Sequence, residues 1–583
     1  METERPDTLK IVNERVEEFK DLYDRMDDTS KLLYPVENPY QLTLYDSEKS
    51  VDDDASISIT SSLPAIYANA SVTALIDGEW QVKPVRVEGK ISDRQSMAIK
   101  NFADDVLNQI DEYLLTEFGI SSLNVWNANH ACIRSIVIGR LLVQAGEDGK
   151  FGITYIPCDA RWTPFRLGRW VAHRTWRSKG ELVKEYSNKA GVDTAFLASL
   201  SAKGVHGVVD YWDNEKNEVW VTGQTEITQG RVAVASGTLL FKRTNSFHTP
   251  PFIVSTVSAG FMLRDAEYLK HEFEDILQFN RHRYEDHNRN QSIKATMGLN
   301  ILFPRHEREI RAEDATDVIK LPKPDTTRHV PPGGLARLVP MPDLNRAFIE
   351  GDTQTQQEIQ MGGISNAELA DTKEDRTAVW LATQGRIRAS RLKPRVECLQ
   401  VAREALIRLA MLEFKAAGKD NFTIGLTGGK RTYSISKLGD PGTYRIKCRL
   451  MTRTKEEEIA NIAEAAAARN AGIPQAIIDR DILMAEDPEE WEKLRKSQAA
   501  AEADPALALW EQAYNMIDEA EDLTDENEAN AKLLYSKQLA LTAYNMVVQR
   551  MSQTMPPESV TPAKQETPKG SAAGLVSLLG RAG

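Results

Sequence analysis

The chain has 583 residues, of which 41% are hydrophobic, 27% charged and 7% aromatic, close to the averages of soluble globular proteins. This length and composition exclude a small disulfide scaffold, a collagen-like repeat and a wholly disordered chain. No apolar run reaches roughly 18 residues, and the acidic N-terminus lacks a secretory signal core, so we expect a cytosolic protein without a membrane anchor. The widely spaced cysteines are predicted to be reduced core residues: Cys132, Cys158, Cys398 and Cys448.

The first half of the chain predicts an α+β body over residues 1–260. It begins with a helix over Thr8–Leu33, where Val12, Val16, Phe19, Tyr23 and Met26 form one apolar stripe. Further helices are predicted over Ser92–Phe118 and Leu123–Gly139, and a β-hairpin joins residues 141–143 to 153–155. Short strands follow at residues 208–212, 219–222 and 238–243.

The second half changes character and becomes mainly helical. An unbroken helical pattern from Met262 to Ser292 is followed by a Pro-rich stretch of short strands and by a helix over Asp343–Met361 that ends at Gly362-Gly363. A polar loop then leads to a long helix, predicted over Thr372–Ala417, that is kinked or broken near Lys393-Pro394. A strand pair at residues 422–426 and 444–450, helices over 455–555 and a disordered tail from residue 556 complete the predicted order.

The net charge of −13 is distributed unevenly along the sequence. Residues 455–531 contain six basic and 21 acidic residues, a net charge of −15, so the remainder of the chain carries +2. Residues 386–408 contain seven basic and two acidic residues. The simplest interpretation of the acidic segment is an exposed helical region that repels DNA.

The sequence contains no recognisable catalytic motif. Residues 425–431 resemble a phosphate-binding loop, but Ile424 and Arg431 stand where a Walker A loop requires Gly and Ser or Thr. His271-Glu272 cannot begin a zincin helix, because Asp275 occupies the second histidine position. A metal-ligand group could be formed by His282, Glu285, Asp286 and His287, although such mixed groups on a surface helix are usually solvated. We therefore predict no enzyme activity, no catalytic residue, no metal and no cofactor.

Two basic segments could contact nucleic acid. From Arg161 to Arg177, arginines alternate with aromatic residues, which is typical of a nucleic-acid contact but equally of a strand pair with tryptophans in the core and arginines facing acidic neighbours. The basic block at 386–408 is either a solvated or ion-paired face or a phosphate contact. Its candidate DNA contacts are Arg386, Arg388, Arg391, Lys393 and Arg395.

The order of these elements resembles that of the portal proteins of tailed bacteriophages. Local similarities are Pro331-Pro332-Gly333-Gly334 before Leu338-Val339-Pro340, then Asp343-Leu344-Asn345, and Gly362-Gly363-Ile364-Ser365. The resemblance implies a predominantly helical α+β fold with long stem helices. Its parts would be a wing (1–260), a first stem helix (261–294), a clip (295–342), a second stem helix (343–361), a tunnel loop (362–371), a wing continuation (372–454), an acidic helical crown (455–555) and a disordered tail (556–583).

The resemblance also implies a function. Such a protein forms a ring, expected to be a dodecamer, at one capsid vertex of the virion after assembly in the host cytoplasm. Double-stranded DNA passes through the ring during packaging and ejection. Its partners would be terminase, the tail adaptor, and the major capsid and scaffold proteins, with no membrane.

The candidate site residues lie on the predicted tunnel loop and second stem helix. The stem residues carry a net charge of −3, which would give the channel a weakly repulsive lining through which DNA can slide. The tunnel-loop candidates are Gly362, Gly363, Ser365, Asn366, Glu368 and Asp371. The channel-lining candidates are Asp343, Arg346, Glu350, Asp352 and Glu358.

Two alternatives from other classes remain open at the level of sequence. An acidic helical scaffold or adaptor protein without a DNA channel would be a monomer or dimer. An enzyme such as a nuclease with an unrecognised carboxylate site would cleave DNA in the presence of a divalent metal.

Overall fold

The computed structural model divides the chain into two compact units, Met1–Glu486 and Asp487–Gly583, and each is described by itself. The fold is mixed α+β and mostly helical, as predicted. The described residues are 8–34, 40–42, 57–86, 91, 93–145, 151–187, 189, 191–222, 237–245, 248–257, 273–302, 306–309, 327–330, 337–338, 346–362, 378–417, 421–424, 431–451, 455–483, 491–492, 495–496, 498–499, 504–522 and 526–554.

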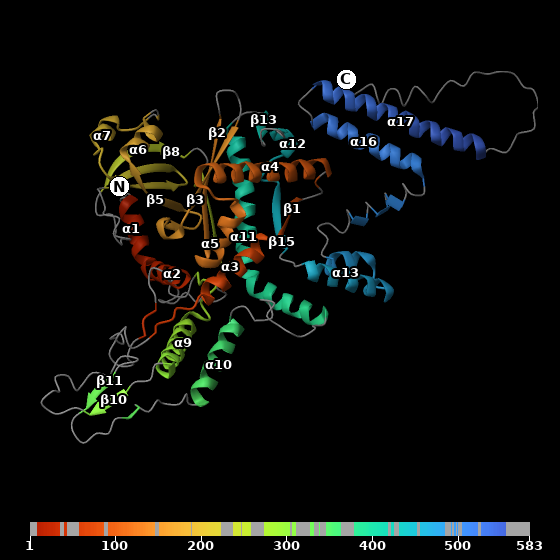
Figure 1. The fold of residues 1–583 in the computed structure, drawn as a ribbon. Helices are drawn as coiled ribbons and strands as arrows, with labels where there is room; N and C mark the ends of the chain where they lie inside the picture. Colours follow the sequence, from red (N-terminus) through yellow and green to blue (C-terminus); the bar gives the residue numbers. More distant parts are fainter. Residues whose placement is uncertain are drawn as a thin grey trace, which may run out of the picture. The chain divides into compact units, whose positions relative to one another are not determined.

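Two antiparallel sheets form the first part of the larger unit (Figure 1). The five-stranded sheet has the order β4-β5-β6-β7-β8, with strands β4 (Phe165–Arg166), β5 (Trp170–Ser178), β6 (Val205–Asp213), β7 (Lys216–Thr222) and β8 (Gly237–Thr244). The three-stranded sheet has the order β3-β2-β9, with β2 (Ile136–Ala145), β3 (Phe151–Cys158) and β9 (Phe252–Thr256). The short turn η1 (Ala160–Trp162) and the helices α6 (Lys179–Tyr186) and α7 (Thr194–Ser199) connect these strands.

These sheets confirm the predicted hairpin and the three predicted strands. Leu142 pairs with Thr154 in the hairpin of β2 and β3. The predicted helix over Leu123–Gly139 is too long, because α5 ends at Ile133 and β2 begins at Ile136. Ser135, with a positive φ of 56°, separates the two elements. The β-branched residues that follow it are buried in the sheet, so their packing outweighs any helical continuation.

The N-terminal helix is divided in two but presents one apolar stripe. Helices α1 (Thr8–Glu18) and α2 (Lys20–Leu33) meet at Phe19, and the side chains of the predicted stripe are all buried. Phe19, Tyr23 and Met26 pack on Phe165 and Val171 of the five-stranded sheet. The predicted stripe is therefore confirmed, and it fixes this helix to the body.

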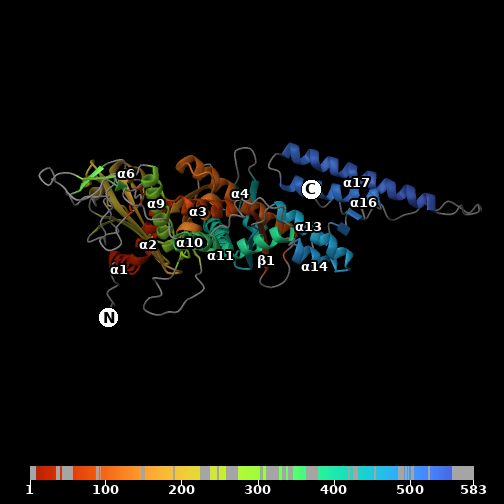
Figure 2. The ribbon, with the colours of Figure 1, turned by 60° about the horizontal axis from the view of Figure 1, so that its bottom comes forward.

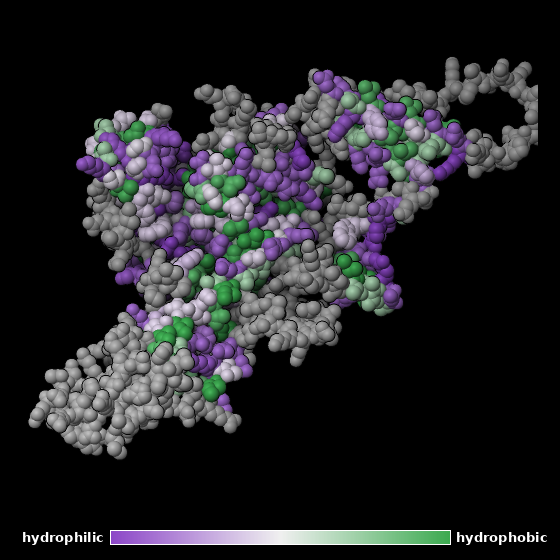
Figure 3. All heavy atoms as spheres, viewed as in Figure 1, coloured by the Kyte–Doolittle hydropathy of each residue, from purple (hydrophilic) through white to green (hydrophobic). Residues whose placement is uncertain are grey.

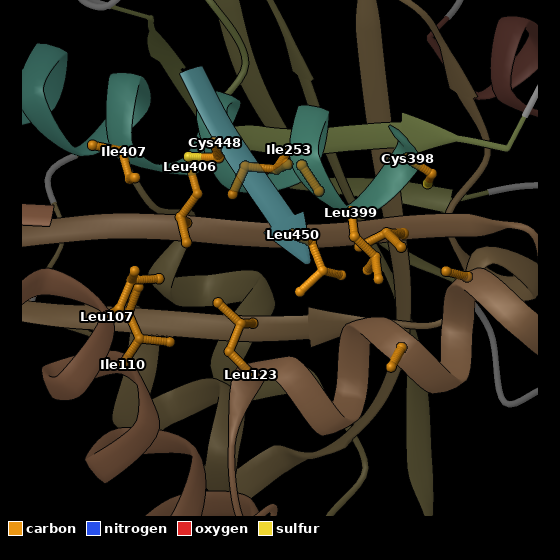
Figure 4. Close-up of a cluster of buried hydrophobic side chains, with 14 of the residues drawn as sticks. Leu107, Ile110, Leu123, Ile253, Cys398, Leu399, Leu406, Ile407, Cys448 and Leu450 are labelled. Carbon is orange, nitrogen blue, oxygen red and sulfur yellow. The ribbon is translucent and has the colours of Figure 1, made fainter. Parts of the chain in front are cut away.

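The main core lies where helices cross over a two-stranded ribbon (Figure 4). Side chains of α4 (Asp93–Phe118) and α5 (Leu123–Ile133) meet those of α11 (Ala378–Ala416), and Leu399 of α11 and Leu450 lie among them. The ribbon pairs β1 (Glu79–Arg86) with β15 (Tyr444–Met451). Helix α3 (Leu63–Ile76) packs against α5 and adds to this core.

The predicted pairing of residues 422–426 with 444–450 is wrong. Strand β13 (Asn421–Ile424) pairs with β14 (Arg431–Ser434), which is followed by the short helix α12 (Ile435–Leu438). Strand β15 instead pairs with β1, more than 350 residues earlier in the sequence, with Lys83 opposite Lys447. Such a distant partner leaves no local signal in the sequence.

The predicted crown over residues 455–555 crosses the boundary between the two units. Helix α13 (Lys455–Asn470), α14 (Gln475–Ile477) and the π-helical turn at Ile478–Ile482 belong to the larger unit. Helices α16 (Pro505–Asp522) and α17 (Glu526–Thr554) form an antiparallel hairpin in the smaller unit. The predicted tail lies outside the described residues.

Two further sequence predictions concern residue types. All four cysteines are buried and free, as predicted. Among the described helices, none combines the length and the apolar character that crossing a membrane requires.

Candidate functional site

The candidate site is a pair of helices in the larger unit that lie side by side (Figures 1 and 2). They are α9 (Arg281–Leu302) and α10 (Arg346–Gly362). Between them in sequence, β10 (His306–Glu309) pairs in parallel with β11 (Thr327–Val330) and antiparallel with β12 (Arg337–Leu338). The predicted order of helix, small strand module and helix is therefore present.

The first helix of the pair is displaced from its predicted position. The described part of the predicted helix before Arg281, Phe273–Asn280, consists of turns, and α9 continues ten residues beyond Ser292 into the predicted clip. Phe273 has a positive φ of 54°, and the Asp275 carboxylate accepts a hydrogen bond from Leu277 N at 2.8 Å. Ile276 and Leu277, which belong to the predicted apolar stripe, are buried in the main core, but as part of a turn and not of a helix.

This segment, Phe273–Asn280, is named the anchor turn because it joins the helix pair to three body helices and to the link between α5 and β2. Its Glu274 carbonyl accepts hydrogen bonds from Ser135 Oγ at 2.5 Å and from Arg395 Nη2, on α11, at 3.3 Å. Its Glu274 carboxylate lies 3.2 Å from Arg25 of α2, and Ile276 N donates to Cys132 O of α5 at 3.0 Å.

The end of the anchor turn reaches the second helix of the pair. Asn280 Nδ2 donates to the carbonyl of Ile359, on α10, at 2.9 Å. Asp275 also accepts from the Thr29 hydroxyl of α2 and pairs with Arg281 at 2.7 Å. The base of the helix pair is thus held by buried, directional bonds that fix its orientation on the body.

Apart from Tyr284 and Ile359, which belong to the main core, the described contacts between α9 and α10 are polar. Asp352 of α10 is 2% exposed and pairs with Lys294 of α9, while Arg283 of α9 lies 2.8 Å from Glu358 of α10. His287 is buried in the same interface, and the cost of desolvating its charged form lowers the pKa of the imidazole, an effect that the nearby Asp352 opposes. Within the described residues, His287 Nδ1 and Asp352 Oδ1 have no hydrogen-bond partner.

The four residues weighed as a metal-ligand group on α9 do not come together. His282, Glu285 and Asp286 are exposed, whereas His287 is buried against α10, so the group is split between two sides of the helix. No cluster of three or more histidine, cysteine or acidic side chains that could hold a metal occurs in the part of the chain that the structure describes.

An extended segment, residues 57–61, lies along α9 and is named the strap. Its alternate backbone N–H groups donate to side chains one helical turn apart: Ile57 N to Thr296 Oγ1 at 2.9 Å, Ile59 N to Ser292 Oγ at 2.7 Å, and Ser61 N to Asn288 Oδ1 at 2.8 Å. On its other edge, Ser58 Oγ accepts from Leu42 N at 3.1 Å. The strap fastens the body to the first helix of the pair.

The described side chains on the outer face of α10 are mostly polar and include no lysine or arginine, although Arg283 of α9 pairs with Glu358 there. A shallow groove there is lined by Ile349, Glu350, Thr353, Gln354, Gln357 and Glu358. None of the described α10 side chains, residues 348–359, is a lysine or arginine. The predicted lining charge needs correction, because Asp352 is buried and paired with Lys294, and Glu358 is paired with Arg283. Glu350 is exposed, as a lining residue should be.

Other lining and loop candidates lie outside the described residues. Arg346 begins α10, but its side chain is not described, and Gly362 ends the helix. The undescribed candidates are Asp343, Gly363, Ser365, Asn366, Glu368 and Asp371.

The basic block lies on α11, which bends along its length around Pro394 (Figure 1). Lys393 and Arg391 are exposed and remain candidates for DNA contact. Arg395 is not accessible for that role, because it is buried and bonded to Glu274 O. The side chains of Arg386 and Arg388 are not described, although both lie on the helix.

Most described contacts of the aromatic and basic segment at residues 161–177 are packing contacts and ion pairs within the body. Trp170 is buried with Tyr211, Arg174 is buried, and Arg177 pairs with Glu185. Arg161 Nη1 lies 3.2 Å from Asp27 of α2. Trp170, Arg161 and Arg177 thus follow the strand-pair alternative, whereas Arg166 and Arg169 of the same run are exposed.

Sequence reasoning missed the anchor turn and the strap. A usable signal existed for the strap, since Asn288, Ser292 and Thr296 recur every four residues on one side of α9. Comparison with known proteins gives no further guide: no protein-family model matches the chain, and no curated protein is detectably similar to it.

Proposed function

We propose that the chain is one subunit of a ring that conducts double-stranded DNA, the role of a bacteriophage portal protein. The observation that carries this proposal is the excursion formed by α9, the β10–β12 module and α10, which leaves the body and returns to it at the anchor turn. In this proposal, the helix pair, which is fixed to the body at one end, is the stem, and the small β10–β12 module between the two helices is the clip.

The outer face of α10 supports a conducting role. Tight binding to DNA depends on cations that neutralise phosphates and release counterions. The described α10 side chains on this face include no lysine or arginine, and the nearby Arg283 of α9 is paired with Glu358, so DNA in contact with the face would slide rather than be held. Twelve copies around a channel would multiply this property.

The proposal includes partners and location. The ring would occupy one capsid vertex of the virion after assembly in the host cytoplasm, next to the major capsid and scaffold proteins. The β10–β12 module would dock terminase during packaging and the tail adaptor afterwards. The chain would perform no covalent chemistry and need no cofactor, so pure protein should neither hydrolyse ATP nor cleave DNA.

Negative-stain electron microscopy of the purified full chain tests the ring. We expect closed particles with a central hole, and mass photometry should give a single dominant multiple of the subunit mass. Particles of only monomer or dimer mass at micromolar concentration would contradict the proposal and favour a scaffold or adaptor protein.

The DNA role needs a separate measurement. Glu350→Lys should preserve rings but slow DNA packaging, with a defect that shrinks as salt rises, while Glu350→Gln should have a smaller effect. Unchanged packaging by Glu350→Lys rings at low salt would mean that this face of α10 does not line the path of DNA.

A further inference from the structure

The smaller unit packs its two helices through small side chains. Ala506, Ala513 and Ala520 are buried on α16 at intervals of seven residues, and Ser536 and Ala543 are buried on α17 at the same interval. Small residues in this repeat let two helices approach closely. Several larger apolar side chains of both helices are left exposed.

These larger side chains form a second apolar surface on each helix. On α16, Leu507, Trp510 and Tyr514 follow the spacing of one helical face, and Tyr514 is 69% exposed. On α17, the corresponding stripe consists of Leu534, Leu541, Tyr544 and Val548. Leu534 and Leu541 are 68% and 61% exposed. Figure 3 shows hydrophobic residues gathered over α16 and α17 on the side in view. Exposed apolar surface of this extent marks an interaction site.

The charges of the two helices are complementary rather than alike. Helix α16 contains five acidic residues and no lysine or arginine, and Glu511 is exposed beside Trp510. Helix α17 contains two acidic and three basic residues, and its Lys537 is exposed between Leu534 and Leu541. Contact between two α16 surfaces would oppose acid to acid, whereas contact between α16 and α17 brings opposite charges together.

We propose that the exposed surface of α16 in one subunit packs on the exposed surface of α17 in the next copy of the chain. Because two different surfaces meet, the contact is heterologous, and repetition of it closes into a ring when the rotation between copies allows. The inference rests on the proposed ring and assigns one of its subunit contacts to the hairpin. The occupant is a second copy because each surface complements the other in both apolar character and charge.

The first test removes apolar area from the full-length protein. Trp510→Ala should raise the subunit concentration needed for half-assembly at least about tenfold, the loss typical of a buried tryptophan in an interface. Gln512→Ala is the matched control, since Gln512 is exposed on a different side of α16, and it should assemble normally. Circular dichroism of both variants checks that the helices are retained. Equal assembly of the two variants would overturn the inference.

The second test identifies which surfaces meet. The four native cysteines are buried, so a full chain carrying Tyr514→Cys and Leu541→Cys can be treated with a flexible bis-maleimide. A heterologous contact predicts a ladder of linked chains on a denaturing gel, and neither single-cysteine variant should give more than monomer. Dimers from one single variant would indicate like-on-like packing. Monomer alone from the double variant would indicate that the surfaces are covered within one chain. Both results contradict the proposal.

The two proposals fail in different ways. Rings that persist with Trp510→Ala and give no ladder would leave the conduit in place and reject the hairpin contact. A ladder from the double-cysteine variant, together with the absence of rings from the wild-type chain in the microscope, would support the contact and reject the conduit.

Discussion

The main core of the larger unit and the α9/α10 pair are built from different interactions. The core buries Phe102, Leu406 and Ile407 completely or nearly so, and most of its members are apolar. The helix pair contributes Tyr284 and Ile359 to this core, but it also buries Asp352, His287 and Asn288, which are held by ion pairs and side-chain hydrogen bonds. Apolar burial contributes large net stability, whereas each polar contact contributes little net stability but fixes geometry.

This difference separates a rigid platform from a positioned but weakly held extension. Regions with few apolar contacts open at lower free energy than the global fold, and moving elements are drawn from them. We therefore expect the helix pair to be oriented by the anchor turn and to exchange amide hydrogens faster than α4 or α11. The four predictions below test this difference in order of decreasing effect.

Phe102→Ala should have the largest effect. The Phe102 ring contacts Tyr433, Phe414 and Phe422 edge-on, with centroids 5.5, 5.8 and 6.0 Å away, so its loss creates a cavity that cannot easily collapse. We expect a loss of about 3–5 kcal/mol in the free energy of unfolding, measured by denaturant titration. Phe118→Ala, at an exposed site on the same helix, should cost about 0.5 kcal/mol. Similar losses in the two variants would mean that this core is not the main source of stability.

Glu413→Gln should stabilise the body at high pH. Burial raises the pKa of the Glu413 carboxyl from 4.5 to about 8, although it accepts a hydrogen bond from Val143 N at 2.6 Å. A raised folded-state pKa means that the stabilising contribution is complete below about pH 4.5 and is lost as pH rises through 8. A glutamine keeps the acceptor without the charge, so the variant should gain about 1–3 kcal/mol at pH 8 to 9 and almost nothing at pH 5.

The control for this pH profile lies on the same helix. Glu404 accepts a hydrogen bond from Cys448 N at 2.9 Å, but its side chain is only partly buried. Thermal denaturation of Glu404→Gln at both pH values should show no gain that appears only at high pH. If Glu413→Gln follows the same profile as Glu404→Gln, the carboxyl of Glu413 does not hold a proton in the folded state.

Many of these features were predicted from sequence, and the reasons for the failures are physical. The stripe from Val12 to Met26 and the hairpin at Leu142 and Thr154 rest on local periodicity, which the fold preserves. The pairing of β15 with β1 depends on a partner hundreds of residues away, which local patterns do not encode.

The candidate site was predicted less well than the body. The helical sequence pattern that ends at Ser292 covers both the anchor turn and the first part of α9. Ile276 and Leu277 fit a helical stripe, yet they enter the core as part of a turn that Asp275 caps. Asp352 was interpreted as a lining charge because sequence does not show that Lys294 lies opposite it. Apolar spacing thus located the helices, but polar partners decided where α9 begins and which acids face outward.

The helix pair should respond to pH in the opposite sense to the Glu413 carboxyl, and in the same sense as the buried His130 and His173 of the body. Burial lowers the pKa of His287, so the folded protein binds the proton less tightly than the unfolded chain. The stability contributed by neutral His287 is therefore lost as pH falls below its ordinary value of about 6.5. We expect amide exchange in α9 and α10, corrected for the intrinsic rate, to accelerate between pH 7.5 and 5.5.

Two variants on α9 decide whether His287 is responsible. His287→Gln should abolish most of this acid-dependent acceleration, and His282→Gln, at an exposed position on the same helix, should leave it unchanged. The free-energy change caused by His287→Gln should be smaller than that caused by Glu413→Gln, because His287 affects only the local opening of α9 and α10 and not the unfolding of the whole body. Equal behaviour of the two histidine variants would assign the pH response to another group.

Ser292→Ala should have the smallest effect, confined to the strap. A helix rises about 6 Å over four residues and a strand about 6.6 Å over two, so side chains on α9 can meet alternate N–H groups of residues 57–61 without strain. Ser292 Oγ is the middle contact of the three and accepts from Ile59 N at 2.7 Å. Its loss should cost about 0.5–1.5 kcal/mol and should speed amide exchange at residues 57–61, while the unfolding midpoint of the body stays nearly constant. Ser292→Thr, which keeps a hydroxyl, should preserve most of the protection at Ile59. If Ser292→Ala lowers the stability of the whole body as Phe102→Ala does, the strap is part of the rigid platform and the separation between the two regions is wrong.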